Sequence, residues 1–166
     1  MERETVKHSI DPVFDKNSRV LILGSMPSPK SRETGFYYGN PGNRFWKAIA
    51  GVYGEQEPIG PEKRREFVIM HRIALWDVIA ECSIIGASDA SIRDVKANDL
   101  SRILGPSDIQ CIFTTGRTAF GYYMEYCYKS TNVSPVYLPS PSGANCANFS
   151  LDDLVREYAV IREYTG

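Results

Sequence analysis

Residues 19–24, RVLILG, form a short run of apolar side chains that ends in glycine. A strand in a parallel sheet is covered on both faces, so its sequence is almost continuously apolar instead of alternating. Three later runs have a similar character, at residues 73–82 (IALWDVIAEC), 108–116 (DIQCIFTTG) and 134–140 (SPVYLPS). These runs predict four strands in one mostly parallel sheet.

Helical patterns lie between and after these runs. Residues 43–50 and 61–72 can each form a helix, the second with proline at its first position. Residues 117–129 place apolar side chains on one helical face, and Ser150 can cap a last helix through a capping box with Asp153. Strands that alternate with helices predict a three-layer α/β/α fold with a four-stranded, mostly parallel central sheet.

The composition is that of one globular domain. The chain has 166 residues, of which 43% are hydrophobic and 23% are charged. This length suits a single core, so we expect one domain over residues 1–166, with residues 1–16 as an N-terminal segment that is free to flex. The formal net charge of −1 excludes a broadly basic surface, so a face that binds nucleic acid must be local.

No apolar run is as long as a membrane span, and the first ten residues, MERETVKHSI, lack the apolar core of a signal peptide. We therefore expect a cytoplasmic protein that does not associate with membranes. We also expect a monomer.

The cysteines do not suggest a metal site. They are far apart, without a Cys-x-x-Cys pair or a neighbouring histidine: Cys82, Cys111, Cys127 and Cys146. Zinc and iron–sulfur sites need clustered ligands, so we expect no metal and no cofactor, and we interpret the four residues as reduced thiols, mostly in the core.

Three loops that follow strands are candidates for a functional site. In an open parallel sheet, ligands bind outside the carboxyl ends of the strands. The loop after residue 24 runs for about twenty residues without a regular pattern, and such long loops are usually functional. Shorter loops follow the third and fourth runs. We expect the loops at 25–43 and 139–149 to lie side by side at the carboxyl ends of the strands.

Two of these loops resemble those of a known family. LILGSMPS (21–28), followed by GFYYGNPGNRFWKAI (35–49), and LPSPSGAN (138–145), followed by SLDDLVREY (150–158), are similar to motifs of the uracil-DNA glycosylase superfamily. The hypoxanthine (deoxyinosine)-DNA glycosylases and the mismatch-specific uracil-DNA glycosylases are the branches that the chain resembles most. The resemblance extends from the first strand to the last helix, and both motifs occur in the expected order.

This resemblance implies a monofunctional DNA glycosylase of base-excision repair. Such an enzyme flips a deaminated base, here hypoxanthine or uracil, out of double-stranded DNA and hydrolyses its N-glycosidic bond. The chemistry stabilises charge that appears in the transition state and positions one water against the sugar carbon. It requires neither a metal nor another cofactor.

The first motif supplies residues that the resemblance assigns to the base and to the water. Gly24, Ser25 and Met26 would face the base. Many relatives carry Asp or Asn at the position of Met26 to place the water, and methionine cannot do this. The resemblance therefore transfers that role to Asn43, with Asn40 as the alternative. An uncharged amide is a poor base, so the mechanism would be dissociative.

The resemblance assigns the other site residues to recognition. Tyr38 would stack on the flipped base, and Ser140 would contact it where relatives carry His or Asn. Ala144 stands where relatives often carry a bulkier leucine wedge, so we expect modest turnover and a preference for bases that leave the stack easily. The residues that would contact DNA are Ser28, Ser142, Gly143, Ala144 and Asn145.

Several of these residues have structural interpretations as well. Asn43 could serve only as a helix cap, and the two roles are compatible. Tyr38 could be a core residue, although its place between Gly35 and Pro41 favours the functional interpretation. For Phe45 and Trp46, which lie on a predicted helix, we favour core packing.

Charged residues elsewhere receive structural interpretations. Asp77 and Asp89 could hydrogen-bond loops around the pocket, but we favour their interpretation as solvated or loop-capping residues. His8, in the terminal segment, and His71, near a helix end, are not placed for catalysis. A last group of cations would lie near the DNA face, where they could contact phosphate or be solvated: Lys30, Arg32, Arg44 and Arg117.

Two other functions remain open from the sequence. The chain could be a nucleotide or nucleic-acid binding module without catalysis, with Met26 as the sign of lost activity. It could instead be a nucleoside-cleaving or phosphate-binding enzyme on a doubly wound sheet, although it lacks a glycine-rich phosphate loop.

Overall fold

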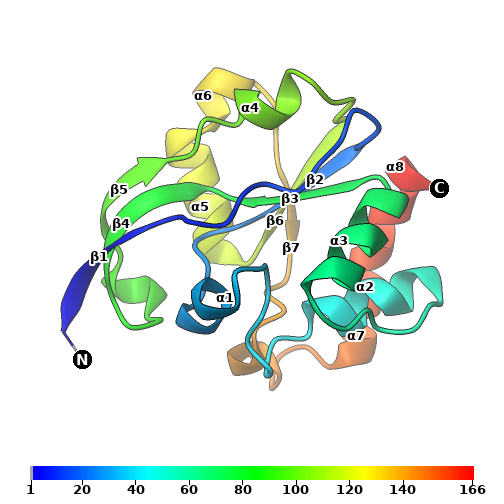
Figure 1. The fold of residues 1–166 in the computed structure, drawn as a ribbon, viewed down its shortest axis with the longest axis horizontal. Coiled ribbons are helices and arrows are strands. Elements are labelled where there is room, and N and C mark those ends of the chain that lie inside the picture. Colours follow the sequence, from blue (N-terminus) through cyan, green and yellow to red (C-terminus); the bar gives the residue numbers. More distant parts are fainter. Residues whose placement is uncertain (1) are drawn as a thin grey trace.

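The computed structural model describes residues 2–166 and has a parallel sheet at its centre (Figure 1). The four strands are β3, β2, β6 and β7 in spatial order, and every neighbouring pair is parallel. Their bounds are β2 Val20–Gly24, β3 Ile73–Asp77, β6 Cys111–Thr115 and β7 Val136–Leu138. All residues of β2, β3 and β6 are buried, as expected of strands covered on both faces. The prediction of a four-stranded parallel sheet is confirmed.

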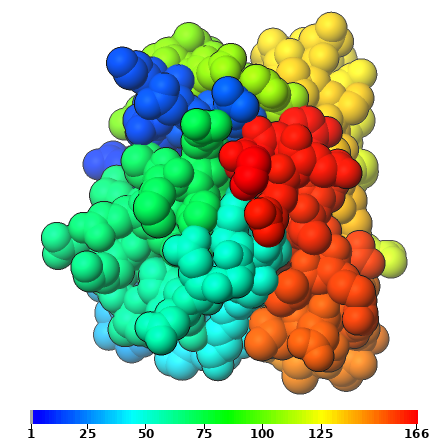
Figure 2. Space-filling view, turned by 90° about the vertical axis from the view of Figure 1, so that its right-hand side faces the viewer, coloured from blue at the N-terminus to red at the C-terminus, as the bar shows by residue number. Residues whose placement is uncertain are grey.

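Helices cover both faces of this sheet. Figure 1 shows α2, α3, α7 and α8 on one side and α5 and α6 on the other, and Figure 2 shows α2 and α3 beside the C-terminal helices on the first of these faces. The helices are α1 Pro29–Thr34, α2 Phe45–Tyr53, α3 Pro61–Met70, α4 Ser101–Leu104, α5 Arg117–Tyr126, α6 Tyr128–Thr131, α7 Leu151–Tyr158 and α8 Arg162–Thr165, with short 3₁₀ turns at Asp89–Ser91, Gly143–Asn145 and Ala159–Ile161. Among residues 2–166, no helix has the length and apolar character needed to cross a membrane.

The helix ends and the core agree with several sequence interpretations. Ser150 and Asp153 form the predicted capping box at the start of α7. Phe45 and Trp46 are buried in the core, at 0% and 2% exposure. All four cysteines are free thiols, and only Cys146 is exposed.

A second, antiparallel sheet was not predicted. It consists of β1 Arg3–Lys7, β4 Ile79–Ile85 and β5 Arg93–Ala97, in the order β1-β4-β5. The expectation of a flexible N-terminal segment is wrong for its described part, residues 2–16, because β1 pairs with β4 along its whole length and Val13 forms a β-bridge with Leu75. Residue 1 lies outside the described residues. Half-exposed strands such as β1 and β5 lack the apolar runs by which the central strands were recognised.

The run at 73–82 is two strands, not the single second strand that we expected. The chain leaves the parallel sheet after Asp77, and β4 begins at Ile79 in the antiparallel sheet. The amide of Asn98 stabilises this break by donating to the carbonyl oxygens of Asp77 at 2.8 Å and of Ile79 at 3.3 Å. The break therefore depends on a residue about twenty positions away. The long loop after β2 also differs from expectation, because it contains α1.

Candidate active site

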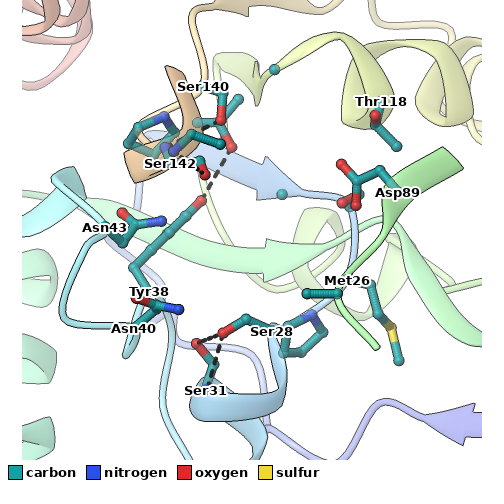
Figure 3. A pocket seen from close by; sticks show the side chains of 18 of the residues that line it. Met26, Ser28, Ser31, Tyr38, Asn40, Asn43, Asp89, Thr118, Ser140 and Ser142 are labelled. Atoms are coloured by element: carbon teal, nitrogen blue, oxygen red, sulfur yellow. Dashed lines mark hydrogen bonds between the residues drawn. The ribbon is translucent and has the colours of Figure 1, made fainter. Parts of the chain in front are cut away.

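A pocket of about 520 Å³ opens at the carboxyl ends of the parallel strands. The loops after β2, β6 and β7 all contribute to its walls, as do the end of β3 and the turn after β4. Figure 3 shows Tyr38, Asn43, Ser140 and Ser142 along one side and Met26, Asp89 and Thr118 along the other. This is the edge of the sheet at which ligands of open α/β folds bind.

The loop after β2 is fixed by its own side chains. Ser28 caps α1 by accepting from the amide of Ser31 at 3.1 Å, and the hydroxyl of Ser31 accepts from the amide of Gly39 at 2.9 Å. The indole of Trp46 donates to the carbonyl oxygen of Tyr37 at 3.0 Å. These bonds hold the segment 35–46 against the core and leave few of its aromatic side chains at the pocket.

Tyr38 is an aromatic residue of this loop that reaches the pocket. Its ring stacks on that of Phe45, with centroids 4.0 Å apart and planes inclined by 12°. Its backbone has φ = 53°, a conformation that a bulky side chain rarely adopts unless its surroundings enforce it. Burial and the nearby Asp77 carboxylate raise the pKa of the Tyr38 hydroxyl well above its ordinary value, so the ring is neutral at physiological pH.

Asn43 and Asn40 both line the pocket, and both side chains bind backbone amides. The Oδ1 atom of Asn43 accepts from the amide of Phe45, the first residue of α2, at 2.9 Å. The Oδ1 atom of Asn40 accepts from the amide of Gly42 at 2.9 Å. A carbonyl oxygen has two lone pairs, so each amide keeps one acceptor site and its NH₂ group for a ligand. Asn43 is half-buried, whereas Asn40 is exposed at the mouth.

The loop after β7 lies directly against the loop after β2. A Cβ atom on Gly143 would come within 2.9 Å of the carbonyl oxygen of Gly42, so the two backbones touch. The amide of Arg44 donates to the carbonyl oxygen of Pro141 at 2.9 Å. The guanidinium of Arg44 also donates to two carbonyl oxygens of the second loop, those of Phe149 and Ser142. The interpretation of Arg44 as a solvated cation is therefore wrong, because its side chain joins the two loops.

Hydrogen bonds also fix the second loop internally. The hydroxyl of Ser140 accepts from the amide of Ser142 at 3.2 Å, and the hydroxyl of Ser142 accepts from the amide of Ala144 at 3.2 Å. The side-chain amide of Asn145 donates to the carbonyl oxygen of Ser140 at 3.1 Å. The loop therefore presents short polar side chains to the pocket on a backbone that is already ordered.

A buried pair of hydrogen-bonded side chains lies at the floor of the pocket and was missed from the sequence. Asp77, at the end of β3, is 4% exposed and contacts the pocket, and its Oδ2 atom lies 2.8 Å from the Nε2 atom of His8. The interpretation of Asp77 as solvated is wrong, and His8, which we did not place at the site, bonds to it from behind the pocket wall. These residues are 69 positions apart, so no local pattern could reveal the pair.

The far wall has a different character. The side chain of Met26 has no hydrogen-bond partner among residues 2–166 and packs against the small cluster that includes Ile79 and Ile84. Asp89 is exposed on its surface, yet the atoms around it desolvate the carboxylate in part and raise its pKa above the ordinary value, while the nearby Thr118 hydroxyl opposes that shift. This wall offers a ligand an apolar surface beside one acid.

Comparison with known proteins identifies the family. Residues 12–159 match the sequence profile of the Uracil DNA glycosylase superfamily. This chain belongs to the uracil DNA glycosylase superfamily. It is 37% identical over 143 residues to a protein of Methanosarcina acetivorans named hypoxanthine DNA glycosylase, covering 84% of this chain and 89% of the relative. A protein of the same name from Methanosarcina barkeri is 32% identical over 142 residues, covering 84% and 88%.

A solved structure supports the same assignment. The solution NMR structure of a Methanosarcina acetivorans protein, described as a candidate uracil DNA glycosylase, superposes with a TM-score of 0.79 at 35% identity. The superposition covers 98% of this chain and 100% of the other. The resemblance that the two loop motifs predicted is therefore confirmed.

In this superfamily member, nearly all the residues assigned from the motifs come together. The pocket is lined by Gly24, Ser25, Met26, Ser28, Tyr38, Asn40, Asn43, Ser140, Ser142, Gly143 and Ala144. Asn145 stands behind them and supports Ser140. Among residues 2–166, no group of three or more His, Cys, Asp or Glu side chains is arranged to hold a metal ion.

Proposed function

We propose that this protein is a monofunctional DNA glycosylase of base-excision repair that removes hypoxanthine, uracil or both from double-stranded DNA. The superfamily supports a glycosylase acting on DNA, and two relatives named hypoxanthine DNA glycosylase support the deaminated purine as a substrate. A monomeric state, a cytoplasmic location and independence from metals stay predictions.

The observation that carries this proposal is the position of Tyr38. Its ring is held between the stacked Phe45 and the open pocket, at the junction of two loops that bind each other. An aromatic wall beside an open, polar pocket suits a base that has been rotated out of the duplex, because every base has a face that can stack. The two loops would then contact the DNA on either side of the extruded nucleotide.

The bond-breaking step needs stabilisation of an anionic base and of a cationic sugar. The amide N–H groups of Ser25 and Met26 follow β2 and donate to no other backbone group of residues 2–166. These donors suit the developing negative charge on the leaving base. The remaining lone pair of Asn43 Oδ1 can accept a hydrogen bond from the attacking water and orient it, but an amide does not deprotonate water. The N-glycosidic bond would therefore break largely before the water adds to the sugar.

The second loop supports the choice of substrates. Ser140 and Ala144 are small, and they offer a flipped base and the emptied stack less contact than larger side chains would. Bases that leave the helix easily are then favoured, and a deaminated base in a mispair unstacks at a lower cost than a base in a normal pair.

A cleavage assay tests the proposal. A labelled duplex with one deoxyinosine or one deoxyuridine is incubated with the protein and then treated with alkali, which breaks the strand at an abasic site. We expect protein-dependent breaks at the deaminated nucleotide and none in the matched duplex with deoxyadenosine or deoxycytidine. Tight binding of the deoxyinosine duplex without breaks would instead favour a non-catalytic binding module.

A further inference from the structure

His8 and Asp77 form a buried, hydrogen-bonded pair at the wall of the pocket. The imidazole Nε2 atom lies 2.8 Å from the Oδ2 atom of Asp77, and the two side chains are 3% and 6% exposed. Asp77 is the last residue of β3, and the backbone amide of His8 donates to the carbonyl oxygen of Ala80 at 2.7 Å. Both side chains therefore start from backbone that is fixed by sheet pairing.

The second oxygen of Asp77 is free to accept a hydrogen bond from a ligand. Among residues 2–166, no group donates to Oδ1. This atom would lie 2.5 Å from a Cβ atom on Gly24, and the same Cβ would lie 3.6 Å from the hydroxyl of Tyr38. The absence of a side chain at Gly24 thus keeps open the space between the carboxylate and the aromatic wall, and Asp77 and Tyr38 line one pocket.

A carboxylate at this place can distinguish a deaminated base from its parent. Adenine N1 and cytosine N3 carry a lone pair, whereas hypoxanthine N1 and uracil N3 carry a hydrogen. An ionised carboxylate only accepts hydrogen bonds, so it attracts the ring N–H and repels the ring lone pair. Guanine and thymine also carry a ring N–H, so this contact excludes adenine and cytosine only.

We propose that His8 is a positioning residue that makes the pocket selective for bases with a ring N–H. The Nε2–H group of His8 holds Oδ2 of Asp77 and thereby directs Oδ1 toward the base. Without that donor the carboxylate can rotate, and its buried charge is left unpaired. This inference rests on the proposed function only in taking a nucleobase as the occupant of the pocket.

Equilibrium binding tests this role independently of catalysis. Two duplexes are compared that differ at one nucleotide, which carries either hypoxanthine or unsubstituted purine, whose N1 has a lone pair. A 2′-fluorine on that nucleotide destabilises the cationic sugar and so prevents cleavage. The wild-type protein should bind the hypoxanthine duplex about tenfold or more tightly, the effect of losing one hydrogen bond to a charged group.

Three variants separate positioning from folding. His8→Phe fills the same space without a donor and should reduce the preference to about twofold or less, whereas His8→Gln retains an N–H donor and should restore most of it. Asp77→Asn keeps the packing, and its amide oxygen should face His8, so its NH₂ group faces the pocket and the preference should invert toward purine. This variant keeps the test valid if His8→Phe does not fold.

The outcomes are distinct from those of the cleavage assay. A purely structural role for His8 would weaken binding of both duplexes equally and leave their ratio unchanged. An unchanged ratio in folded His8→Phe, or in Asp77→Asn, overturns the inference. If the wild-type protein cleaves no deaminated base but shows the binding preference, the proposed catalytic function fails while the role of His8 stands.

Discussion

Gly42 and Gly143 hold the two loops of the active site in backbone contact, because any side chain on Gly143 would meet the carbonyl oxygen of Gly42 at 2.9 Å. Neither glycine has a positive φ angle, so close approach rather than an unusual backbone conformation is the constraint. The contact brings the loop that carries Tyr38 and Asn43 against the loop that carries Ser140. The architecture of the pocket therefore depends on the absence of a side chain at Gly143.

Gly143→Ala should separate these loops. The added methyl group meets backbone, which cannot rotate away, so we expect a loss of about 1–3 kcal/mol in the free energy of unfolding and at least a tenfold fall in the cleavage rate. Denaturant unfolding and single-turnover cleavage of a deoxyinosine duplex measure the two effects.

Gly121→Ala provides the matched control. Gly121 lies within α5 with no atom within 4 Å of the added methyl group, so alanine should stabilise the helix by about 0.5–1 kcal/mol and leave cleavage unchanged. If Gly143→Ala behaves like this control, the loop contact has no role in activity.

The parallel sheet was predictable because strands that are buried on both faces have almost continuously apolar sequences. Residues 20–24 and 111–115 are apolar or small throughout, so their own sequence is enough to indicate that they are buried. The break after Asp77 does not interrupt the apolar run, because it depends on the side chain of Asn98. A continuous apolar run shows that residues are buried, but it does not show which sheet they join.

The site was predictable where neighbouring residues form a motif, and not where the fold assembles distant ones. The motif residues, including Tyr38, Asn43 and Ser140, do line one pocket. His8 could not be placed because β1 is polar and half-exposed, so the segment that carries it showed no sign of joining a sheet. Arg44 was misread for a similar reason, because its partners belong to a loop about a hundred positions away.

Alkaline pH should destabilise the fold through buried tyrosines. Burial raises the pKa of Tyr37, Tyr38 and Tyr158, so the folded state keeps these protons at a pH at which the unfolded state has lost them. These tyrosines stabilise the folded state fully below the unfolded pKa of about 10. As the pH rises further, the free energy of unfolding falls by roughly 1.4 kcal/mol per pH unit for each residue. Urea unfolding between pH 8 and pH 11 measures this slope.

Tyr38→Phe supplies the control for the alkaline effect. It removes one titrating group and only a long hydrogen bond to Thr115, at 3.4 Å. The free energy of unfolding should therefore fall less steeply with pH, by roughly 1.4 kcal/mol per pH unit, the contribution of one proton. An identical slope in the variant would mean that Tyr38 ionises equally in the folded and unfolded states.

Chelation should not affect activity. The proposed chemistry uses backbone amides, an amide side chain and water, and none of these needs a metal ion. We expect the single-turnover rate on a deoxyinosine duplex to be unchanged after dialysis against EDTA and in the presence of a reductant. A loss of cleavage that added zinc restores would contradict the proposed mechanism.

Tyr38→Ala should weaken recognition of every substrate. It removes a stacking platform worth roughly 1–3 kcal/mol, so binding of a flipped base should fall about 5- to 150-fold, for hypoxanthine and uracil alike. Tyr38→Phe keeps the ring and its stack on Phe45 and should bind nearly as well as wild type. The measurement is equilibrium binding of duplexes with a cleavage-resistant nucleotide. If the alanine variant binds them as tightly as the phenylalanine variant does, Tyr38 is only a core residue.

Asn43 has a structural bond and a proposed catalytic role, and two substitutions can separate them. Asn43→Ala loses the acceptor for the amide of Phe45, which should cost about 0.5–2 kcal/mol of stability, and it also removes the group that would orient the water. The single-turnover rate should therefore fall roughly a hundredfold or more while DNA affinity changes little. Asn40, at the exposed mouth, is the alternative holder of this role, and Asn40→Ala should have a much smaller effect on the rate.

Asn43→Ser decides between the two roles. A serine hydroxyl can accept from the amide two residues ahead, as asparagine does here, so the stability should stay within a few tenths of a kcal/mol of wild type. The shorter side chain does not extend into the pocket, so the cleavage rate should be as low as that of Asn43→Ala. Thermal unfolding and single-turnover cleavage of the deoxyinosine duplex are measured on the same preparations. A serine variant with the wild-type rate would leave Asn43 only its structural bond to the amide of Phe45 and would move the search for the water-positioning residue to Asn40.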